Sequence, residues 1–542
     1  MLMKSKKKWL IAILILLLQS SVMIICAVNK KAIYIDEFYT LKYSATLYNN
    51  NDEKINWFDR SVIENEYTSH EEFINWLSVD GSESVFAQKP STILKNAVMS
   101  RTYYFLLNIV MSFFQGKCSF FFSTALNLIL FFLCAFTMYK IIKEITDNDL
   151  CALAAIAIYG FSKMAIQTVE YVRFYEMYNL FTLLFFYNIV CMIKSDRVKY
   201  INIGVFCLLI WLGYGNSQYM LFMALYGTIF LLISLIYNRR WEDIARLVCF
   251  GLVGLIIFIK LISSMLVQTF SEKSNVSQLW NAVLKLKEMT ADVFWHDVKG
   301  YYSFILEEPA VCCLIILALI TVIVYLINRC IRKRAQTSFS VKSVYGISFV
   351  LMALGYIAAV AVVAPKVEWR YISNIWALLI IGLSVILTDY IKNNKILYIV
   401  IALCICLDFF TIGSYGRWDI NTVGEYNDTA QEVAEAISGK DIIYMDVKQN
   451  RQRQALIHSA YFWSDESRVF ITAPSIFEEG VEKMSEILMQ DDIIVWVNTE
   501  SAWENKVRVL MENCGYTQFE YIYEHNTGLD GQISFILVEC RK

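Results

Sequence analysis

Residues 9–28 read WLIAILILLLQSSVMIICAV, and this apolar stretch decides the fold class. A helix that spans a bilayer needs about 20 consecutive, mostly apolar residues, and the stretch has that length. Lys4, Lys6, Lys7 and Lys8 precede it, and no small-residue cleavage site follows it. We therefore expect an uncleaved membrane helix with its N-terminus in the cytoplasm.

Further stretches along the chain have the apolar character of membrane helices. They lie near residues 118–143, 150–168, 174–194, 200–214, 217–237, 244–264, 309–328, 343–364, 371–390 and 395–413. With the first helix they predict about 11 spans. The loops that alternation places in the cytoplasm all carry Lys or Arg, as the positive-inside rule requires. The same alternation leaves three larger segments outside, namely the loop 29–117, the loop 265–308 and the tail from about residue 415.

The composition agrees with a membrane protein that carries one water-soluble domain. Of the 542 residues, 57% are hydrophobic and 18% are charged, whereas soluble chains average about 45–50% apolar and about 25% charged residues. These values exclude an ordinary soluble enzyme, a disordered chain and a nucleic-acid binder. Residues 415–542 carry a net charge of −11 and the remainder +9. We expect a membrane domain over residues 1–414 and an extracytoplasmic domain over residues 415–542.

The tail alternates strand and helix patterns, which is typical of a small α/β domain. The expected strands lie at 441–447, 468–472, 491–498, 518–524 and 532–540, the last two as a hairpin, with helices at 429–437, 451–463, 478–489 and 502–514. No glycine-rich phosphate loop is present, so nucleotide binding has no support. Cys514 and Cys540 either form a disulfide or remain two buried thiols.

The first outer loop begins with the most specific polar motif of the chain, YIDEFYT at residues 34–40. Asp36 and Glu37 follow the first helix closely, and a carboxylate that is partly desolvated at the membrane surface becomes a better general base. The pair can also bind a divalent metal or hold an acceptor hydroxyl. The alternative is a solvated loop start or a capping pair for the next helix. Further along this loop, residues 92–114 predict an amphipathic helix that lies in the membrane interface.

Two further motifs lie at the same expected membrane face. Residues 170–178 read EYVRFYEMY, and Arg173 among its tyrosines suits the phosphate of a lipid-linked ligand. The alternative is a snorkelling arginine with interfacial tyrosine anchors. Residues 365–371 read PKVEWRY and add Lys366 and Arg370.

Isolated polar residues complete the set of candidates. Lys260 lies in the outer part of an apolar span, where a charge is costly and therefore indicates a functional role. The alternative is a structural ion pair between Lys260 and Asp408, which is similarly placed in the last span. His296, in the second outer loop, is a candidate metal ligand or base.

The order of these motifs resembles that of the GT-C glycosyltransferases. The matching elements are Asp36-Glu37 after the first span, VRFYEMY at 172–178, and a Glu-x-Arg-Tyr turn at 368–371 before a late span. The similarity is to the bacterial branch that includes protein O-mannosyltransferases and lipid A aminoarabinose transferases, and it covers about residues 1–415. It implies a GT-C-like polytopic fold.

The resemblance also implies a reaction and a set of roles. Such enzymes take a sugar from a polyprenyl-phosphate donor on the outer face of the cell membrane and pass it, with inversion, to a lipid, cell-wall polymer or protein acceptor. Asp36 would be the base and Glu37 would support it. The donor phosphate would be held by Arg173, Tyr175, Arg370 and Tyr371, with Lys260 added from its position and with Glu170, Lys366 and His296 as further candidates. No cofactor follows, and a divalent metal is left open.

One departure and two other functions stay open at this point. Family members often carry His-Pro-Pro-Leu-Tyr-Tyr in the interfacial helix, whereas this chain has Ser-Arg-Thr-Tyr-Tyr at residues 100–104, which puts the acceptor side in doubt. A transporter of lipid-linked glycans would need charged residues along a path through the bilayer, but the candidates cluster at its outer boundary. A non-catalytic membrane scaffold would use the acidic tail to recruit a partner.

Overall fold

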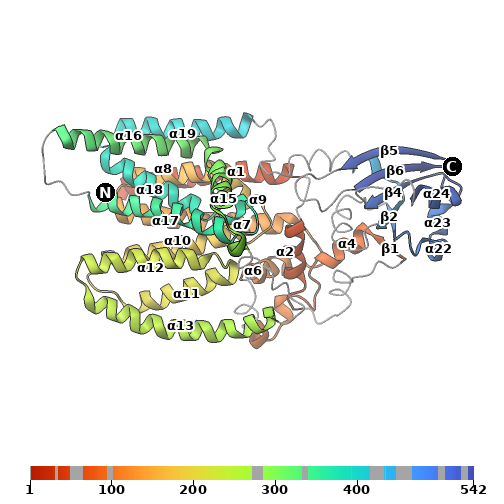
Figure 1. Cartoon of the computed structure of the whole chain (residues 1–542), viewed down its shortest axis with the longest axis horizontal. Coiled ribbons are helices and arrows are strands. Elements are labelled where there is room, and N and C mark those ends of the chain that lie inside the picture. The colour runs from red at the N-terminus through yellow and green to blue at the C-terminus, as the bar shows by residue number, and fades with distance from the viewer. Residues whose placement is uncertain are drawn as a thin grey trace. The chain divides into compact units, whose positions relative to one another are not determined.

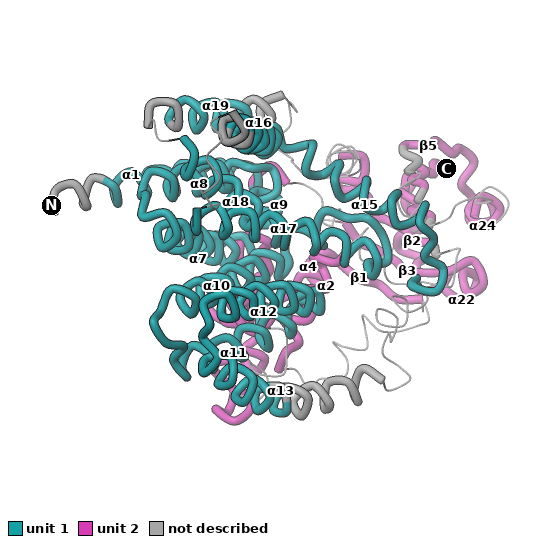
Figure 2. Tube along the Cα trace, turned by 60° about the vertical axis from the view of Figure 1, so that its left-hand side comes forward, with its two compact units in different colours: residues 1–27, 97–103, 123–420 teal, residues 28–96, 104–122, 421–542 magenta. Residues whose placement is uncertain are grey.

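The computed structural model describes most of the chain (Figure 1). The described residues are 2–30, 35–48, 65–93, 102–270, 285–331, 340–391, 394–414, 433, 435–446, 467–498, 507–525 and 535–542. They divide into two compact units that interleave along the sequence (Figure 2). Unit 1 comprises residues 1–27, 97–103 and 123–420, and unit 2 comprises residues 28–96, 104–122 and 421–542. Most of residues 29–117, the expected first outer loop, therefore belong to the same unit as the C-terminal residues.

Unit 1 consists of helices. They are α1 (Leu2–Asn29), α7 (Phe120–Thr146), α8 (Asp149–Phe161), α9 (Lys163–Glu170), α10 (Tyr175–Lys194), α11 (Tyr200–Asn216), α12 (Met220–Tyr237), α13 (Trp241–Phe270), α15 (Ala291–Leu306), α16 (Pro309–Ile331), α17 (Val341–Val363), the 3-10 helix η2 (Trp369–Tyr371), α18 (Ile375–Tyr390) and α19 (Asn394–Ser414). The last residues of α1 and the first residues of α7 belong to unit 2.

Within the described residues, five helices are long and apolar enough to cross a membrane, or up to seven if each of two bent pairs is one span. Shorter apolar helices, among them α11 and α18, accompany them. These helices confirm a polytopic membrane protein, whereas the count of 11 spans stays a prediction.

The structure adds detail to two expectations within this unit. The stretch 150–168 is not one straight helix, because α8 and α9 meet at a bend of 61°. The expected outer loop 265–308 contains helix α15, which meets α16 at a bend of 100°.

Helix α18 lies at the centre of the helices that contact it, which are α8, α10, α16 and α17. All of its residues from Ile375 to Leu387 are buried, as expected for a helix that is apolar all round. Its closest neighbour is α17, and the two backbones approach at Gly346 and Gly382. A Cβ on either glycine would lie 2.8 Å from the carbonyl oxygen of the other. Only glycine allows this approach.

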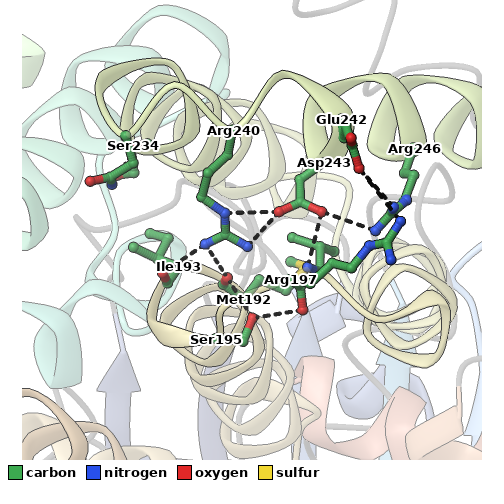
Figure 3. A network of polar contacts seen from close by, with 11 residues as sticks. Met192, Ile193, Ser195, Arg197, Ser234, Arg240, Glu242, Asp243 and Arg246 are labelled. Atoms are coloured by element: carbon green, nitrogen blue, oxygen red, sulfur yellow. Dashed lines mark hydrogen bonds and ion pairs between the residues drawn. The ribbon is translucent and has the colours of Figure 1, made fainter.

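A buried carboxylate joins two connections of unit 1 (Figure 3). Asp243, at the start of α13, pairs with Arg240 at 2.6 Å and with Arg246 at 3.2 Å. It also accepts a hydrogen bond from the backbone N–H of Val198 at 3.1 Å. Arg240 in turn donates to the carbonyl of Ile193, in the last turn of α10, at 3.0 Å. The α10–α11 and α12–α13 connections are therefore fixed to each other, and a carbonyl that the helix end leaves open is satisfied.

Unit 2 contains one six-stranded sheet with the order β1-β3-β2-β4-β6-β5. The strands are β1 (Glu66–Ser69), β2 (Ile442–Asp446), β3 (Arg468–Thr472), β4 (Asp492–Asn498), β5 (Gln518–His525) and β6 (Phe535–Arg541). β2, β3 and β4 run parallel to one another, and β1, β5 and β6 pair antiparallel with their neighbours. The five strands and the terminal hairpin expected in the tail are confirmed, whereas β1 comes from the first outer loop and was not expected.

Short helices complete unit 2. In the first outer loop they are α2 (Ile35–Ala45), α4 (His70–Leu77), η1 (Val85–Ala87) and α6 (Thr102–Ser112), whose first two residues belong to unit 1. In the tail they are α22 (Phe477–Gly480), α23 (Ser485–Leu488) and α24 (Val509–Asn513). The helix expected at 478–489 is therefore two short helices, and the one expected at 451–463 lies outside the described residues. Buried strand residues such as Ile443, Val495 and Val538 form the core of the domain with residues of these helices.

Candidate active site

The turn between α17 and α18 carries a cluster of charges in unit 1. Arg370 forms an ion pair with Glu368, and its Nη1 donates to the hydroxyl of Tyr171 at 3.3 Å. Only 10% of the Arg370 side chain is exposed. Lys366 reaches the same carboxylate, with 2.9 Å between its Nζ and Oε1 of Glu368. Glu368 thus holds two cations together, one buried and one at the surface.

Aromatic rings surround this cluster. The ring of Trp369 lies 5.7 Å from that of Tyr171 and 6.2 Å from that of Tyr175. The guanidinium of Arg370 lies 5.4 Å from the ring of Tyr371, which meets Tyr219 edge-on at 5.4 Å. The segment 170–178 and the turn 365–371, which the sequence identified separately, therefore come together in the fold.

Burial raises the pKa of the Tyr371 hydroxyl above its ordinary value, and nearby Arg370 opposes the increase. The phenol therefore stays protonated at neutral pH and remains a hydrogen-bond donor. Protonated phenols and guanidinium groups are the donors that bind a phosphate.

Helix α9 leads the chain into this cluster, and each of its ends is held by a distant side chain. At its start, the carboxylate of Glu308 accepts hydrogen bonds from the backbone N–H of Met164 at 2.8 Å and of Lys163 at 3.3 Å. At its end, the amide of Asn127 donates to the carbonyls of Val169 in the last turn at 3.1 Å and of Tyr171 at 2.9 Å. An anion at the start of a helix and a donor at its end are favourable.

The bend before α9 occurs at Ser162. Its hydroxyl accepts from the N–H of Ala165 at 3.2 Å, which caps α9, and donates to the carbonyl of Tyr159 at 2.6 Å, near the end of α8. In the sequence, the residues that produce this arrangement are Ser162, Asn127 and Glu308, which are polar residues within or next to apolar stretches. They are too common to have predicted the bend or its supports.

Arg173 and Glu170 lie on either side of Tyr171 in the segment 170–178. Arg173 is half-buried, and its guanidinium lies 5.4 Å from the ring of Phe174. Glu170 is buried at the last position of α9. Both are close in sequence to Tyr171, whose hydroxyl contacts Arg370.

The acidic motif lies in unit 2, in the first turn of α2 rather than in a solvated loop. Asp36 is half-buried, and its backbone carbonyl accepts from the hydroxyl of Thr40 at 3.0 Å. Glu37 is fully buried and forms an ion pair with Lys30. Carboxylates in a first turn are stabilised by the helix dipole, which favours the capping alternative for the backbone. The two neighbours nevertheless differ, because Glu37 is fully buried whereas Asp36 is half-buried.

The remaining candidates lie apart from these two groups. Lys260 is part of α13, but its side chain is outside the described residues, and so the Lys260–Asp408 alternative stays a prediction. His296 projects into solvent with 85% of its side chain exposed, 3.4 Å from a carboxylate oxygen of Asp297. Among the described residues no group of three or more His, Cys, Asp or Glu side chains is arranged to hold a metal. Cys514 and Cys540 are both free thiols.

Tyr103 and Tyr104 of the helix expected at the membrane interface lie within the described residues. Tyr103 contacts the hydroxyl of Ser123 at 2.6 Å and donates to Oδ1 of Asn127 at 2.9 Å. In unit 2, the ring of Tyr104 lies 5.7 Å from that of Tyr43 in α2. Residues 102–112 of the expected helix 92–114 form α6, and residues 94–101 lie outside the described residues.

Solved structures that are similar to this chain include two crystal structures of ArnT from Cupriavidus metallidurans, one bound to undecaprenyl phosphate and one in the apo state. The TM-scores are 0.42 and 0.41, and the sequence identities are 8% and 9%. The matches cover 92% and 90% of this chain and 96% of each ArnT chain. ArnT is a lipid A aminoarabinose transferase with a GT-C fold. No protein-family model and no curated protein sequence matches the chain.

Proposed function

We propose that the chain is an integral-membrane glycosyltransferase that moves a sugar from a polyprenyl-phosphate donor to a lipid, cell-wall polymer or protein acceptor. The observation that supports the proposal most is the cluster around Arg370. A buried guanidinium next to the hydroxyl of Tyr171 and the rings of Trp369 and Tyr371 is suited to a phosphate carried by an apolar chain. Arginine binds phosphate through two parallel hydrogen bonds, which a water-poor environment strengthens.

The proposal assigns the donor phosphate to Arg370 and Tyr371, with Arg173 and Tyr175 added from the family resemblance. Lys366 and Lys260 are further cations for the same phosphate. Glu368 is already bound to Arg370 and Lys366, so it keeps these cations in place before the donor arrives. An incoming phosphate would then share them with Glu368.

The proposed reaction is a single inverting displacement. The acceptor oxygen attacks the anomeric carbon while the bond from that carbon to the phosphate oxygen breaks, and the electron pair leaves with the polyprenyl phosphate. Asp36 takes the proton of the acceptor hydroxyl. The phosphate is a good leaving group that the cations stabilise, so one base is sufficient, whereas glycoside hydrolysis requires two carboxylic groups.

Glu37 receives a supporting role in this proposal. Its carboxylate is buried and forms an ion pair with Lys30, which also belongs to unit 2. We assign Glu37 to the anchoring of the first turn of α2, so that the neighbouring Asp36 keeps a fixed orientation. The proposal places the N-terminus in the cytoplasm and the C-terminal domain, with the reaction, on the outer face of the membrane.

The experiment that tests this function is a transfer assay with the purified full-length chain in detergent. The donors are radiolabelled polyprenyl-phosphate hexoses, and the acceptors are membrane lipid and cell-wall extracts. Asp36→Asn should lower kcat by about 10²- to 10⁴-fold, the usual contribution of a general base, and leave the donor KM unchanged. Glu37→Gln should lower the stability of α2 as well as kcat.

Two outcomes would contradict the proposal. Wild-type turnover by Asp36→Asn would remove the base from the mechanism. No label transfer by the wild-type chain from any hexose donor, with Asp36→Asn behaving identically, would favour the transporter or the scaffold, because a detergent solution has no sealed compartment for transport.

A further inference from the structure

Strand β1 connects the first outer loop to the C-terminal sheet, and both lie in unit 2. The side chain of Asn65, just before β1, donates to the carbonyl of Ile476 at 2.7 Å and accepts from the hydroxyl of Thr472 at 2.7 Å. The ring of Tyr67 meets that of Phe470 edge-on at 5.0 Å. A strand of four residues is not stable alone, so β1 depends on β3 for its conformation.

Helix α4 continues directly from β1. Ser69, the last residue of the strand, is also the N-cap of α4, and its hydroxyl accepts from the N–H of Glu72 at 3.1 Å. The strand therefore fixes where α4 begins and in which direction it runs. Phe73 on α4 stacks on Phe38 of α2, with 5.3 Å between ring centroids and 16° between ring planes. Both rings are almost completely buried.

Helix α2 carries Asp36 two residues before Phe38. Within unit 2, α2 is also held by the Lys30–Glu37 ion pair in its first turn and by α6, where the amide of Asn108 donates to the carbonyl of Ser44 at 2.9 Å. The α6 contact is near the C-terminal end of α2, whereas the Phe38–Phe73 stack is within one turn of Asp36. The α4 contact, and through β1 the sheet, therefore contributes to the position of the acidic end of α2.

We infer that the C-terminal domain is a positioning element for the proposed base, with β1 and α4 as its connection to Asp36. The inference rests on the proposed function and extends it to the acidic tail. A catalytic group that moves by about 1 Å can lose about 100-fold in rate, so loosening β1 should affect kcat although no residue of the sheet touches the reacting atoms. Donor binding, which the proposal assigns to unit 1, should not change.

The test compares proline substitutions at the two opposite edges of the sheet. Thr68→Pro places a proline, which removes a backbone donor and fixes φ, in β1, and Glu520→Pro places one in β5 at the opposite edge of the sheet. Thr68→Val is the conservative control, because the buried hydroxyl of Thr68 has no hydrogen-bond partner among the described residues and valine has the same branched shape. Transfer kinetics and hydrogen exchange of the peptide 35–45 are measured on each full-length variant in detergent.

We expect Thr68→Pro to lower kcat by about 10- to 100-fold with an unchanged donor KM, and to increase exchange in α4 and α2 while β2, β4 and β6 stay protected. Thr68→Val and Glu520→Pro should keep kcat and the protection of α2. The inference is overturned if Thr68→Pro leaves the exchange of α2 unchanged, or if α2 loosens and kcat does not fall. If the wild-type chain transfers no sugar, the proposed function fails, and the exchange data still decide whether the sheet holds α2.

Discussion

Arg370 offers the most quantitative test of the donor site. Lysine at this position would keep the positive charge but lose the planar group that binds Tyr171, Glu368 and, by proposal, two phosphate oxygens. Arg370→Lys should therefore raise the donor KM and change kcat much less. Only 10% of the arginine side chain is exposed, so bulk water will screen the interaction little.

The size of the effect follows from the bonds that are lost. A hydrogen bond to a charged group contributes about 1.5–3 kcal/mol. At 1.36 kcal/mol per factor of ten, the loss of one such bond corresponds to about a 10- to 150-fold rise in the donor KM. The assay is the initial transfer rate as a function of donor concentration in mixed micelles of constant detergent content.

The matched control is Arg197→Lys, the same substitution at a side chain that is 68% exposed and lies 3.5 Å from Glu242. Its donor KM should equal that of the wild type, because exposed ion pairs contribute little. An unchanged donor KM in Arg370→Lys, or an equal rise in both variants, would refute the assignment of the phosphate to this cluster.

Three further predictions concern stability and burial. Asp243→Asn should lower the free energy of unfolding by about 3–5 kcal/mol, because it leaves two paired guanidinium groups without their buried carboxylate. Thermal unfolding in detergent should show a large loss of stability in this variant. Glu242→Gln, at a side chain that is 84% exposed, should cause no such loss. Burial raises the pKa of Cys540 to about 12, so peptide mapping should find this thiol unmodified by an alkylating reagent at pH 8 until the chain is unfolded; a disulfide-linked peptide would contradict the free thiol. The hydrogen bond from Lys440 lowers the pKa of Glu539. This carboxylate therefore stabilises the sheet at a pH above its unfolded-state pKa, and the contribution disappears as the pH falls through the folded-state pKa. Hydrogen exchange of β6, corrected for intrinsic rates, should show this acid dependence in the wild type and lose it in Glu539→Gln.

The sequence predicted the parts of the fold that depend on local pattern. Apolar length identified the long membrane helices, and short apolar runs bounded by polar residues identified the five strands of the tail. It did not predict β1, because a four-residue segment with two aromatic or β-branched side chains has no distinctive period, and its conformation comes from pairing with β3 about 400 positions away.

The candidate site shows the same division between local and distant causes. Residues with rare chemistry for their place, such as Arg370 and the Asp36-Glu37 pair, were identified from type and position. The residues that contact them could not be identified from the sequence. The contact of Tyr171 with Arg370 and the support of α9 by Glu308 join segments whose proximity only the folded chain determines.

The most direct test of the central claim is the anomeric configuration of the product formed by the wild-type chain in detergent. A radiolabelled β-linked polyprenyl-phosphate hexose is supplied, and the transferred sugar is analysed by specific glycosidases and NMR. The account predicts that label reaches the acceptor with the opposite, α configuration and that Asp36→Asn transfers almost none. Retention of the β configuration would contradict the single displacement, and the absence of any transferred label would contradict the glycosyltransferase itself.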